Sequence, residues 1–487
     1  MARVRLVLAV ALLGVFMFGA LRPDALLGLA RGELNIWLEP CYRARFDVPR
    51  DAVTDADLRR VHERLLPAWV LARFAETTRP SPERRDAEAQ SFFLLRHAVA
   101  PDANLVSLFD QLRQALSAQP EVDAERVDYL VWALNDYQRS RHSPYRVEAS
   151  LVEYAGRLQL YARTYRVASE MSARQGDLRL LRRLDSTNLV EGDLGHTGRP
   201  EDGALVLLDR VLAYSVRRVW PTLNPALEGR LDPPRRAMAA AVRAEAFDAL
   251  SPDLLVLLHE GAEDELSLLE VARSVADRRR CGSTFSIWGL PWRGLAAPDR
   301  EELVDALRAS RGSACPKVTP AEAARMIGAS QRLAQTRDLA PAVEELATWV
   351  ARAVSVHELR HVADGSVPSC PGCPTSMGGS TRAELSAYVS SMATPGIGYL
   401  SLMQACHVGA GTESPHRRAL LYLERHLLPE GCDGSPPSDL YARASELELE
   451  LFGSRSSVRI PDDFPQRLDL LEPSAAAVAR LSPTPNR

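Results

Sequence analysis

The sequence has no large excess of charge of either sign: its formal net charge is −4 over 487 residues. Its basic residues are almost all arginine, and Lys317 is the only lysine. The arginines are scattered among acidic residues and form no stripe interleaved with aromatic side chains, the pattern typical of a nucleic-acid-binding surface. The composition therefore gives no reason to expect a nucleic acid as a partner.

The chain also lacks any apolar run after residue 21 that is long enough to span a membrane. Arg3 and Arg5 precede an apolar stretch at residues 6–21, which is typical of an export signal. Residues 1–21 are therefore either a signal peptide or an N-terminal membrane anchor, and both place the rest of the chain outside the cytoplasm. We expect an exported protein, periplasmic or anchored to the membrane if this segment stays uncleaved.

No repeat of fixed period occurs, and 46% of the residues are apolar, so the chain can build ordinary globular cores. In residues 45–280 apolar residues recur mostly at three- and four-residue steps, which predicts a helical domain of unknown role. The predicted helices include residues 147–175, 204–219 and 234–250. The glycine-rich residues 185–203 predict a loop.

A second domain is expected at residues 281–472. It opens with an aromatic, β-leaning stretch at residues 284–292 and continues as helices. The tail at residues 473–487 consists largely of alanine, proline and serine, which predicts disorder. The expected fold class is mainly α, with a helical N-terminal region, a second helical domain and room for a small β-sheet.

The segment His357-Glu358-Leu359-Arg360-His361 has the pattern H-E-x-x-H. Histidines four residues apart lie on one face of a helix, so both imidazoles can reach one Zn²⁺. Glu358 lies close enough to take a proton from a metal-bound water. The alternative is a pair of core histidines on an apolar helix face beside an unrelated glutamate.

Two other histidine–glutamate pairs, His62-Glu63 and His259-Glu260, lack a second histidine four residues later. We expect ordinary surface pairs there.

A third protein ligand leaves the fourth zinc position open for water. Glu384 is the best candidate, on a helix that we expect to begin near Ser380. Thr381 and Glu384 also fit a capping box, in which the glutamate only caps the start of its own helix. Both interpretations remain open from the sequence.

H-E-L-x-H followed by a helical E-x-x-A at residues 384–387 resembles the gluzincin group of zinc metallopeptidases. The match is limited to this motif region. The resemblance implies a zincin-like catalytic domain that hydrolyses a peptide or protein substrate. His357, His361 and Glu384 would hold Zn²⁺, and Glu358 would be the general base. Such enzymes carry a short sheet above the metal helix, and its edge strand binds extended substrate; residues 284–292 are the expected position.

In the expected mechanism, Zn²⁺ lowers the pKa of its water, Glu358 takes the proton, and hydroxide attacks a peptide carbonyl. The resulting oxyanion needs a donor. Four residues downstream of the metal helix could supply it: Tyr388, Tyr399, His407 and His416. Tyr388 is favoured because it lies one turn after Glu384.

Two further residues, one within the motif and one just after it, are candidates for supporting roles. Asp364, three residues after His361, could hold a ligand imidazole by a hydrogen bond or could simply end the helix. Arg360 points away from the helix face that carries His357 and His361. It is expected to be a surface residue or an ion-pair partner.

Seven cysteines in an exported chain allow three disulfides and one unpaired residue. Cys370 and Cys373 form a C-x-x-C in the loop between the two ligand helices. Because the chain has no second C-x-x-C, a disulfide is favoured over half of a zinc knuckle. The other candidates around the site are Cys281, Cys315, Cys406 and Cys432, while Cys41 stands apart; the connectivity stays open.

Three functions remain in competition. The leading hypothesis is a zinc-dependent metallopeptidase, and the second is a non-catalytic helical interaction or scaffold protein in which H-E-x-x-H is coincidental or degenerate. The third keeps the zinc but hydrolyses something other than peptides. Zinc content and the effect of Glu358→Gln separate the second from the others.

Overall fold

The computed structural model describes residues 53–470 except 79, 118–121, 155–156, 185–192, 198–201, 278–296, 315, 336–338, 366, 410–413, 456–457 and 469. The export segment 1–21, the β-leaning stretch 284–292, the tail 473–487, and Cys41, Cys281 and Cys315 lie outside the described residues. The fold is mainly α with one five-stranded sheet, which confirms the expected fold class.

The chain divides into two units, one of residues 1–166 with 184–186 and one of residues 167–183 with 187–487. The dividing point lies well before the predicted boundary at residue 281. The helices that follow the sheet therefore belong to the same unit as the H-E-x-x-H motif.

The first unit packs a helical layer around its own apolar core, which includes Trp69, Phe109 and Leu134. Its helix starts are well specified, because Ser81 and Asp123 cap the backbone N–H groups of the next turn. Its elements in chain order are α4 (Asp55–Arg60), the π-helical turn η1 (Val61–Leu65), α5 (Leu66–Thr78), α6 (Pro82–Ala98), α7 (Ala103–Ser117), α8 (Ala124–Ser140) and β1 (Tyr145–Tyr154).

The predicted helix at residues 147–175 is wrong: this segment forms β1 and β2 (Arg157–Ala173), which pair antiparallel. Val147, Ala149 and Leu151 recur at two-residue steps, and polar residues separate them. That period of two places alternate side chains on opposite faces of a strand. Apolar residues that alternate every two positions also include pairs four residues apart, and such pairs resembled the spacing of a helix.

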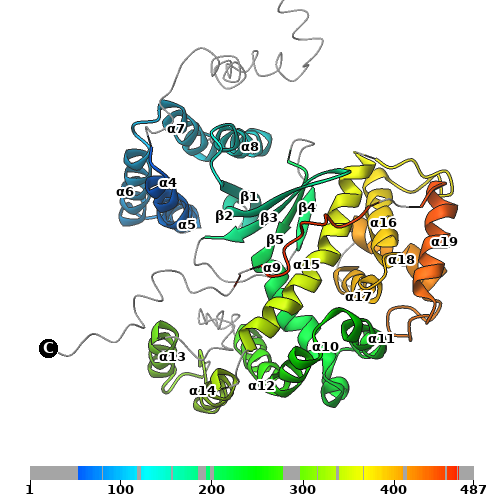
Figure 1. Ribbon diagram of the computed structural model, residues 1–487. Helices are drawn as coiled ribbons and strands as arrows, with labels where there is room; N and C mark the ends of the chain where they lie inside the picture. The colour runs from blue at the N-terminus through cyan, green and yellow to red at the C-terminus, as the bar shows by residue number, and fades with distance from the viewer. Residues whose placement is uncertain are drawn as a thin grey trace, which may run out of the picture. The chain divides into compact units, whose positions relative to one another are not determined.

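The strand order of the sheet is β1-β2-β3-β5-β4 (Figure 1). β3 (Gly176–Arg183) runs parallel to β5 (Ala204–Leu207), and β4 (Gly195–Thr197) pairs antiparallel to β5 at the edge. The glycine-rich segment predicted as a loop therefore contains the edge strand. The predicted helix at residues 204–219 begins as β5 instead, because its first four residues are a fully buried apolar run next to β3.

The second unit continues with helices around a large apolar core. They are α9 (Leu208–Tyr214), η2 (Ser215–Val219), α10 (Trp220–Leu223), η3 (Pro225–Arg230), α11 (Pro233–Ala249), α12 (Pro252–Asp277), α13 (Ala297–Ala309), α14 (Pro320–Gln335), α15 (Leu339–Asp364), α16 (Gly379–Met392), α17 (Gly398–Gly409), α18 (Pro415–Leu427) and α19 (Leu440–Phe452). The predicted helix at residues 234–250 is confirmed as α11.

Helix α15 runs through the middle of this unit (Figure 1). Almost every residue from Ala342 to Arg360 is buried, as expected for a helix covered on all sides. Strands β4 and β5 pack against it, and so do helices α12 and α16. Helix α16 in turn contacts α18 and α19. The motif in the last turns of α15 therefore lies between the edge of the sheet and a layer of helices.

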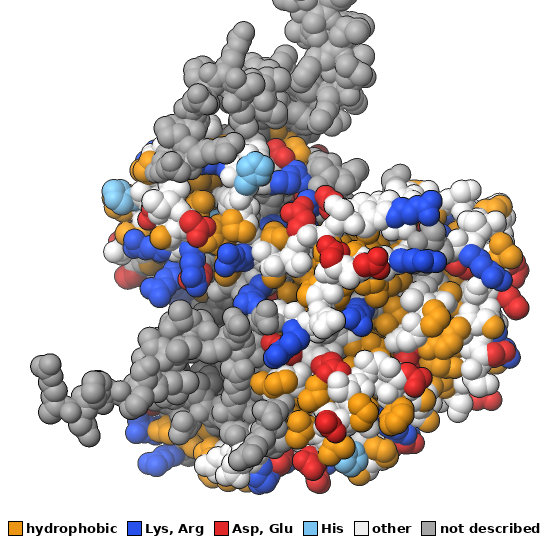
Figure 2. All heavy atoms as spheres, in the orientation of Figure 1, with side chains coloured by type: hydrophobic (Ala, Val, Ile, Leu, Met, Phe, Trp, Pro, Cys, Tyr) orange, Lys and Arg blue, Asp and Glu red, His pale blue; other side chains and the backbone are white. Residues whose placement is uncertain are grey.

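None of the described helices is both long and apolar enough to cross a lipid bilayer. On the face seen in Figure 2, basic and acidic side chains are interspersed.

Among the described residues of the second unit, two disulfides occur: Cys370–Cys373 in the loop between α15 and α16, and Cys406–Cys432. The latter links α17 to the turn after α18 and closes 26 residues of chain.

Removing the Cys406–Cys432 bond in Cys406→Ala/Cys432→Ala should lower the unfolding free energy by about 3.5 kcal/mol for a loop of that length, because the unfolded chain regains conformational entropy. Urea unfolding of the variant and of the oxidised wild type measures the difference. An unchanged midpoint would contradict a stabilising bond.

Candidate metal centre

The two motif histidines converge at the end of α15. His357 Nε2 lies 3.2 Å from His361 Nε2, and the two rings meet edge to face with centroids 4.9 Å apart. Residues four apart on a helix share one face, so α15 itself fixes this pair. His357 is buried, while His361 is half-buried at the edge of a cavity.

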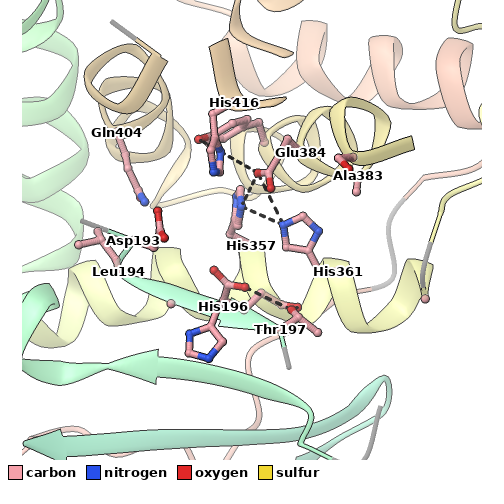
Figure 3. A pocket seen from close by; sticks show the side chains of 15 residues that line it. Asp193, Leu194, His196, Thr197, His357, His361, Ala383, Glu384, Gln404 and His416 are labelled. Atoms are coloured by element: carbon pink, nitrogen blue, oxygen red, sulfur yellow. Dashed lines mark hydrogen bonds and ion pairs between the residues drawn. The ribbon is translucent and has the colours of Figure 1, made fainter. Parts of the chain in front are cut away.

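Helix α16 brings Glu384 to the same point (Figure 3). Its Oε2 atom lies 3.4 Å from His357 Nε2 and 3.7 Å from His361 Nε2. Gly378 occupies the N-cap position of α16, and Thr381 lies buried inside the helix. The capping-box role considered for Glu384 therefore does not apply, and its carboxylate points to the histidines.

The three ligand atoms fit a tetrahedral metal ion. Zinc bonds of about 2.0–2.2 Å to nitrogen and oxygen imply separations of about 3.3 Å between tetrahedral ligand atoms. The three observed separations, 3.2, 3.4 and 3.7 Å, lie close to that value. Glu384 Oε2 is also buried, and its close polar neighbours are imidazole nitrogens, including His416 Nδ1 at 2.9 Å. A buried oxygen in that state, with imidazole nitrogens around it, suits a metal ligand.

Glu358 lies beside this cluster and under the edge strand. Its side chain is buried, and Thr197 Oγ1 lies 3.3 Å from its Oε2 and 3.2 Å from its backbone carbonyl. Gly195 allows this close approach: a Cβ there would lie 2.8 Å from Glu358 Cγ and 2.6 Å from the carbonyl oxygen of Leu205. The edge strand therefore covers the carboxylate and leaves one end of it facing the cavity.

Tyr388 and His416 complete the wall opposite Glu358. The Tyr388 hydroxyl lies 3.0 Å from His416 Nδ1, and that nitrogen lies 2.9 Å from Glu384 Oε2. The ring of Tyr388 packs edge-on against His357 with centroids 4.8 Å apart. Of the four oxyanion candidates from the sequence, these two line the cavity.

The other two candidates lie elsewhere. The Tyr399 hydroxyl donates to the backbone carbonyl of Pro437. His407 contacts the ring of Tyr214, with centroids 6.1 Å apart. Neither residue lines the cavity that holds the H-E-x-x-H motif.

Burial and neighbouring charges shift the pKa values of the site. Burial raises the pKa of Glu358, and the Glu384 carboxylate adds to the shift while the nearby imidazoles oppose it. Burial alone would raise the pKa of Glu384, but the imidazoles around it hold that pKa far below its usual range. Burial, reinforced by the carboxylates of Glu384 and Glu358, raises the pKa of Tyr388 well above its ordinary value. Tyr388 therefore keeps its proton and remains a hydrogen-bond donor at neutral pH.

Asp364 and Arg360 form an ion pair on the other face of α15. Arg360 Nε lies 3.0 Å from Asp364, which is the last residue of the helix, and donates to Ser386 Oγ. Its Nη1 lies 3.1 Å from Glu448 on α19. Arg360 is thus an ion-pair partner, as expected, but is buried and not a surface residue. Through Ser386 and Glu448, Arg360 ties α15 to α16 and α19, and the structure places Asp364 on Arg360 and not on an imidazole.

The cavity over the motif has a volume of 460 Å³, within the usual range for a small-ligand site. The sequence did not single out several of its lining residues, which come from the edge strand and from α17: Asp193, Leu194, Gly195, His196, Thr197 and Gln404. No pattern near these residues indicates a site, since only the tertiary fold brings a short strand over α15.

The two incomplete motifs lie away from this cavity. His259 and Glu260 are exposed, as expected. His62 is fully buried and its Nδ1 contacts the carbonyl of Leu58, so the expected surface position was wrong. Burial lowers the pKa of His62 to about 4.

Comparison of the chain with protein-family models, with curated proteins and with solved structures gave no match.

Proposed function

We propose that this chain is a zinc-dependent metallopeptidase of the gluzincin type. The observation that carries the proposal is the convergence of His357, His361 and Glu384 at tetrahedral spacing, with Glu358 beside them at an open cavity. A divalent cation held by two imidazoles and one carboxylate is a common arrangement for catalytic zinc. The three ligands come from two separate helices, so the spacing is a product of the tertiary fold.

The residues of this chain have distinct roles in the proposed reaction. His357, His361 and Glu384 would hold the zinc ion, which when bound would supply Lewis acidity for activating water and polarising a peptide carbonyl. The Glu358 carboxylate takes a proton from the attacking water and delivers it to the leaving amine. Thr197 holds that carboxylate in place. Tyr388 and His416 donate hydrogen bonds to the carbonyl oxygen as it gains negative charge.

We also propose that the protein acts outside the cytoplasm, either free in the periplasm or held at the membrane by residues 1–21. Disulfides persist mainly in oxidising compartments, and Cys370–Cys373 and Cys406–Cys432 fit such a location.

Metal removal tests the proposed function. We expect the purified protein to hold about one zinc per chain and to cleave unstructured peptides. Chelation will abolish the cleavage and added zinc will restore it. Zinc at 100 times its dissociation constant will also raise the unfolding free energy by about 2.7 kcal/mol, because the folded state alone assembles the three ligands. Elemental analysis and thermal unfolding measure these effects without any assumption about substrate.

His357→Ala and Glu384→Ala should each remove the zinc-dependent stabilisation. His426→Ala is the matched control, because His426 is exposed on α18, away from the cavity. If zinc stabilises all of these variants equally, the three residues are not the ligands. A wild-type protein that binds zinc but cleaves only non-peptide substrates supports a hydrolase of another class. One that binds no zinc supports the scaffold function.

A further inference from the structure

Asp193 is a carboxylate at the mouth of the cavity that the proposed reaction does not use. It directly precedes the edge-strand segment, and its side chain points into the cavity (Figure 3). Its backbone is held on the C-terminal side: Arg210 Nη1 donates to the Asp193 carbonyl at 2.8 Å, and the Leu194 carbonyl accepts from Leu207 N at 2.9 Å. Arg210 thus binds the main chain of Asp193, and the carboxylate is left for the cavity.

No hydrogen bond or ion pair reaches the Asp193 carboxylate from the residues that the structure describes. Asp193 lines the same cavity as Tyr388 and His416. Its carboxylate therefore faces the same space as the groups proposed to bind the scissile carbonyl.

The described lining of the cavity contains neither lysine nor arginine, and its basic groups are four histidines. It includes three carboxylates, Asp193, Glu358 and Glu384. On the face seen in Figure 2, arginines are interspersed with acidic residues, so the lack of arginine here is local. Two of the carboxylates lie at the proposed metal site, and a substrate cation would meet the third, that of Asp193. Gln404, from α17, offers an amide oxygen as a second acceptor.

We infer that the substrate is a peptide with a positively charged group next to the scissile bond, and that Asp193 binds this group. The inference rests on the proposed peptidase function. An ammonium or guanidinium group next to the scissile bond would neutralise the negative charge of Asp193 and donate a hydrogen bond to its carboxylate. The positive group can be the free N-terminal ammonium or the side chain of a lysine or arginine; the chemistry recognised is the same.

Pairs of peptides that differ in one charge test this inference on the zinc-loaded, full-length protein. In one pair the N-terminus is free or acetylated, and in the other a lysine next to the scissile bond is replaced by norleucine. Mass spectrometry locates the cleaved bond. We expect kcat/KM to be about tenfold higher for the charged member of one pair, the effect of one charge-assisted hydrogen bond in a solvated cavity. The pair that responds identifies the source of the charge.

Asp193→Asn should lower kcat/KM about tenfold for the charged peptide and leave the neutral one unchanged. Asp463→Asn, at an exposed position away from the cavity, is the matched control and should keep the full preference. Raising the salt to 1 M should reduce the preference, because the Debye length falls from about 10 Å to about 3 Å.

Equal rates for both members of each pair in the wild type would overturn the inference, as would equal losses for both members in Asp193→Asn. If no peptide is cleaved, the peptidase proposal fails instead. Calorimetric binding of both peptide pairs to the wild type then still tests Asp193. Equal affinity within each pair overturns its role, and tighter binding of the charged member of one pair that Asp193→Asn removes supports it.

Discussion

Glu358→Gln will lower the rate of peptide hydrolysis about 10²- to 10⁴-fold, the range typical of losing a general base. Glutamine has nearly the same shape as glutamate and can still accept a hydrogen bond from Thr197, but it cannot take a proton from water. Glu358 is also not one of the three proposed ligands, so zinc content should stay at the wild-type level. The result to measure is therefore a pair: hydrolysis lost and zinc kept.

Glu260→Gln is the matched control for this change. Glu260 also follows a histidine on a helix, but it is exposed and has no second histidine four residues on. We expect wild-type hydrolysis and zinc content in this variant. Hydrolysis in Glu358→Gln within a few-fold of wild type would show that another group activates the water. Loss of zinc in Glu358→Gln would make Glu358 a ligand and not a base.

The motif region is the part of the site that the sequence predicted best. The geometry of an α-helix alone places His357 and His361 on one face, so the pair depends on local structure only. Glu384 was a candidate with two interpretations, because the T-x-x-E pattern also fits a helix cap. Only the packing of α16 against α15 decides between these, and it places the carboxylate on the imidazoles.

The sheet was the largest error of the sequence analysis. The sheet expected at residues 284–292 lies outside the described residues, and strands occur at residues 145–207, where helices and a loop had been predicted. Strand β4 has only three residues, too few for any alternation to be recognised. Its role in the site depends on its position at the edge of the sheet beside α15, and the local sequence does not indicate that position.

The same reasoning explains why Asp193 and Gln404 could not be predicted. They lie far from the motif in sequence and reach the cavity through β4 and α17, respectively. His416 was considered as a possible donor downstream of the motif, but its contact with Tyr388 and Glu384 depends on the packing of α16 against α18. The histidine pair that one helix brings together was predictable outright, whereas Glu384 and His416 were only candidates and Asp193 and Gln404 were missed.

Tyr388→Phe will lower kcat about 10²- to 10³-fold, the usual cost of removing one donor to a developing oxyanion. Phenylalanine keeps the ring that packs against His357 and removes only the hydroxyl. We therefore expect unchanged zinc content. The raised pKa of Tyr388 keeps its proton in place over the working pH range, so the loss should not depend on pH near neutrality.

Tyr399→Phe provides the matched control, because that hydroxyl donates to the Pro437 carbonyl away from the cavity. Its kcat should equal that of the wild type, even if the lost hydrogen bond costs about 1 kcal/mol of stability.

The Tyr388 hydroxyl and His416 Nδ1 are 3.0 Å apart, so the two groups should act as one unit. The fold loss in kcat of the double variant Tyr388→Phe/His416→Ala should then be much smaller than the product of the fold losses of the two single variants. Fully multiplicative losses would mean that the two side chains act independently, and a Tyr388→Phe variant with normal kcat would reduce Tyr388 to a packing role beside His357.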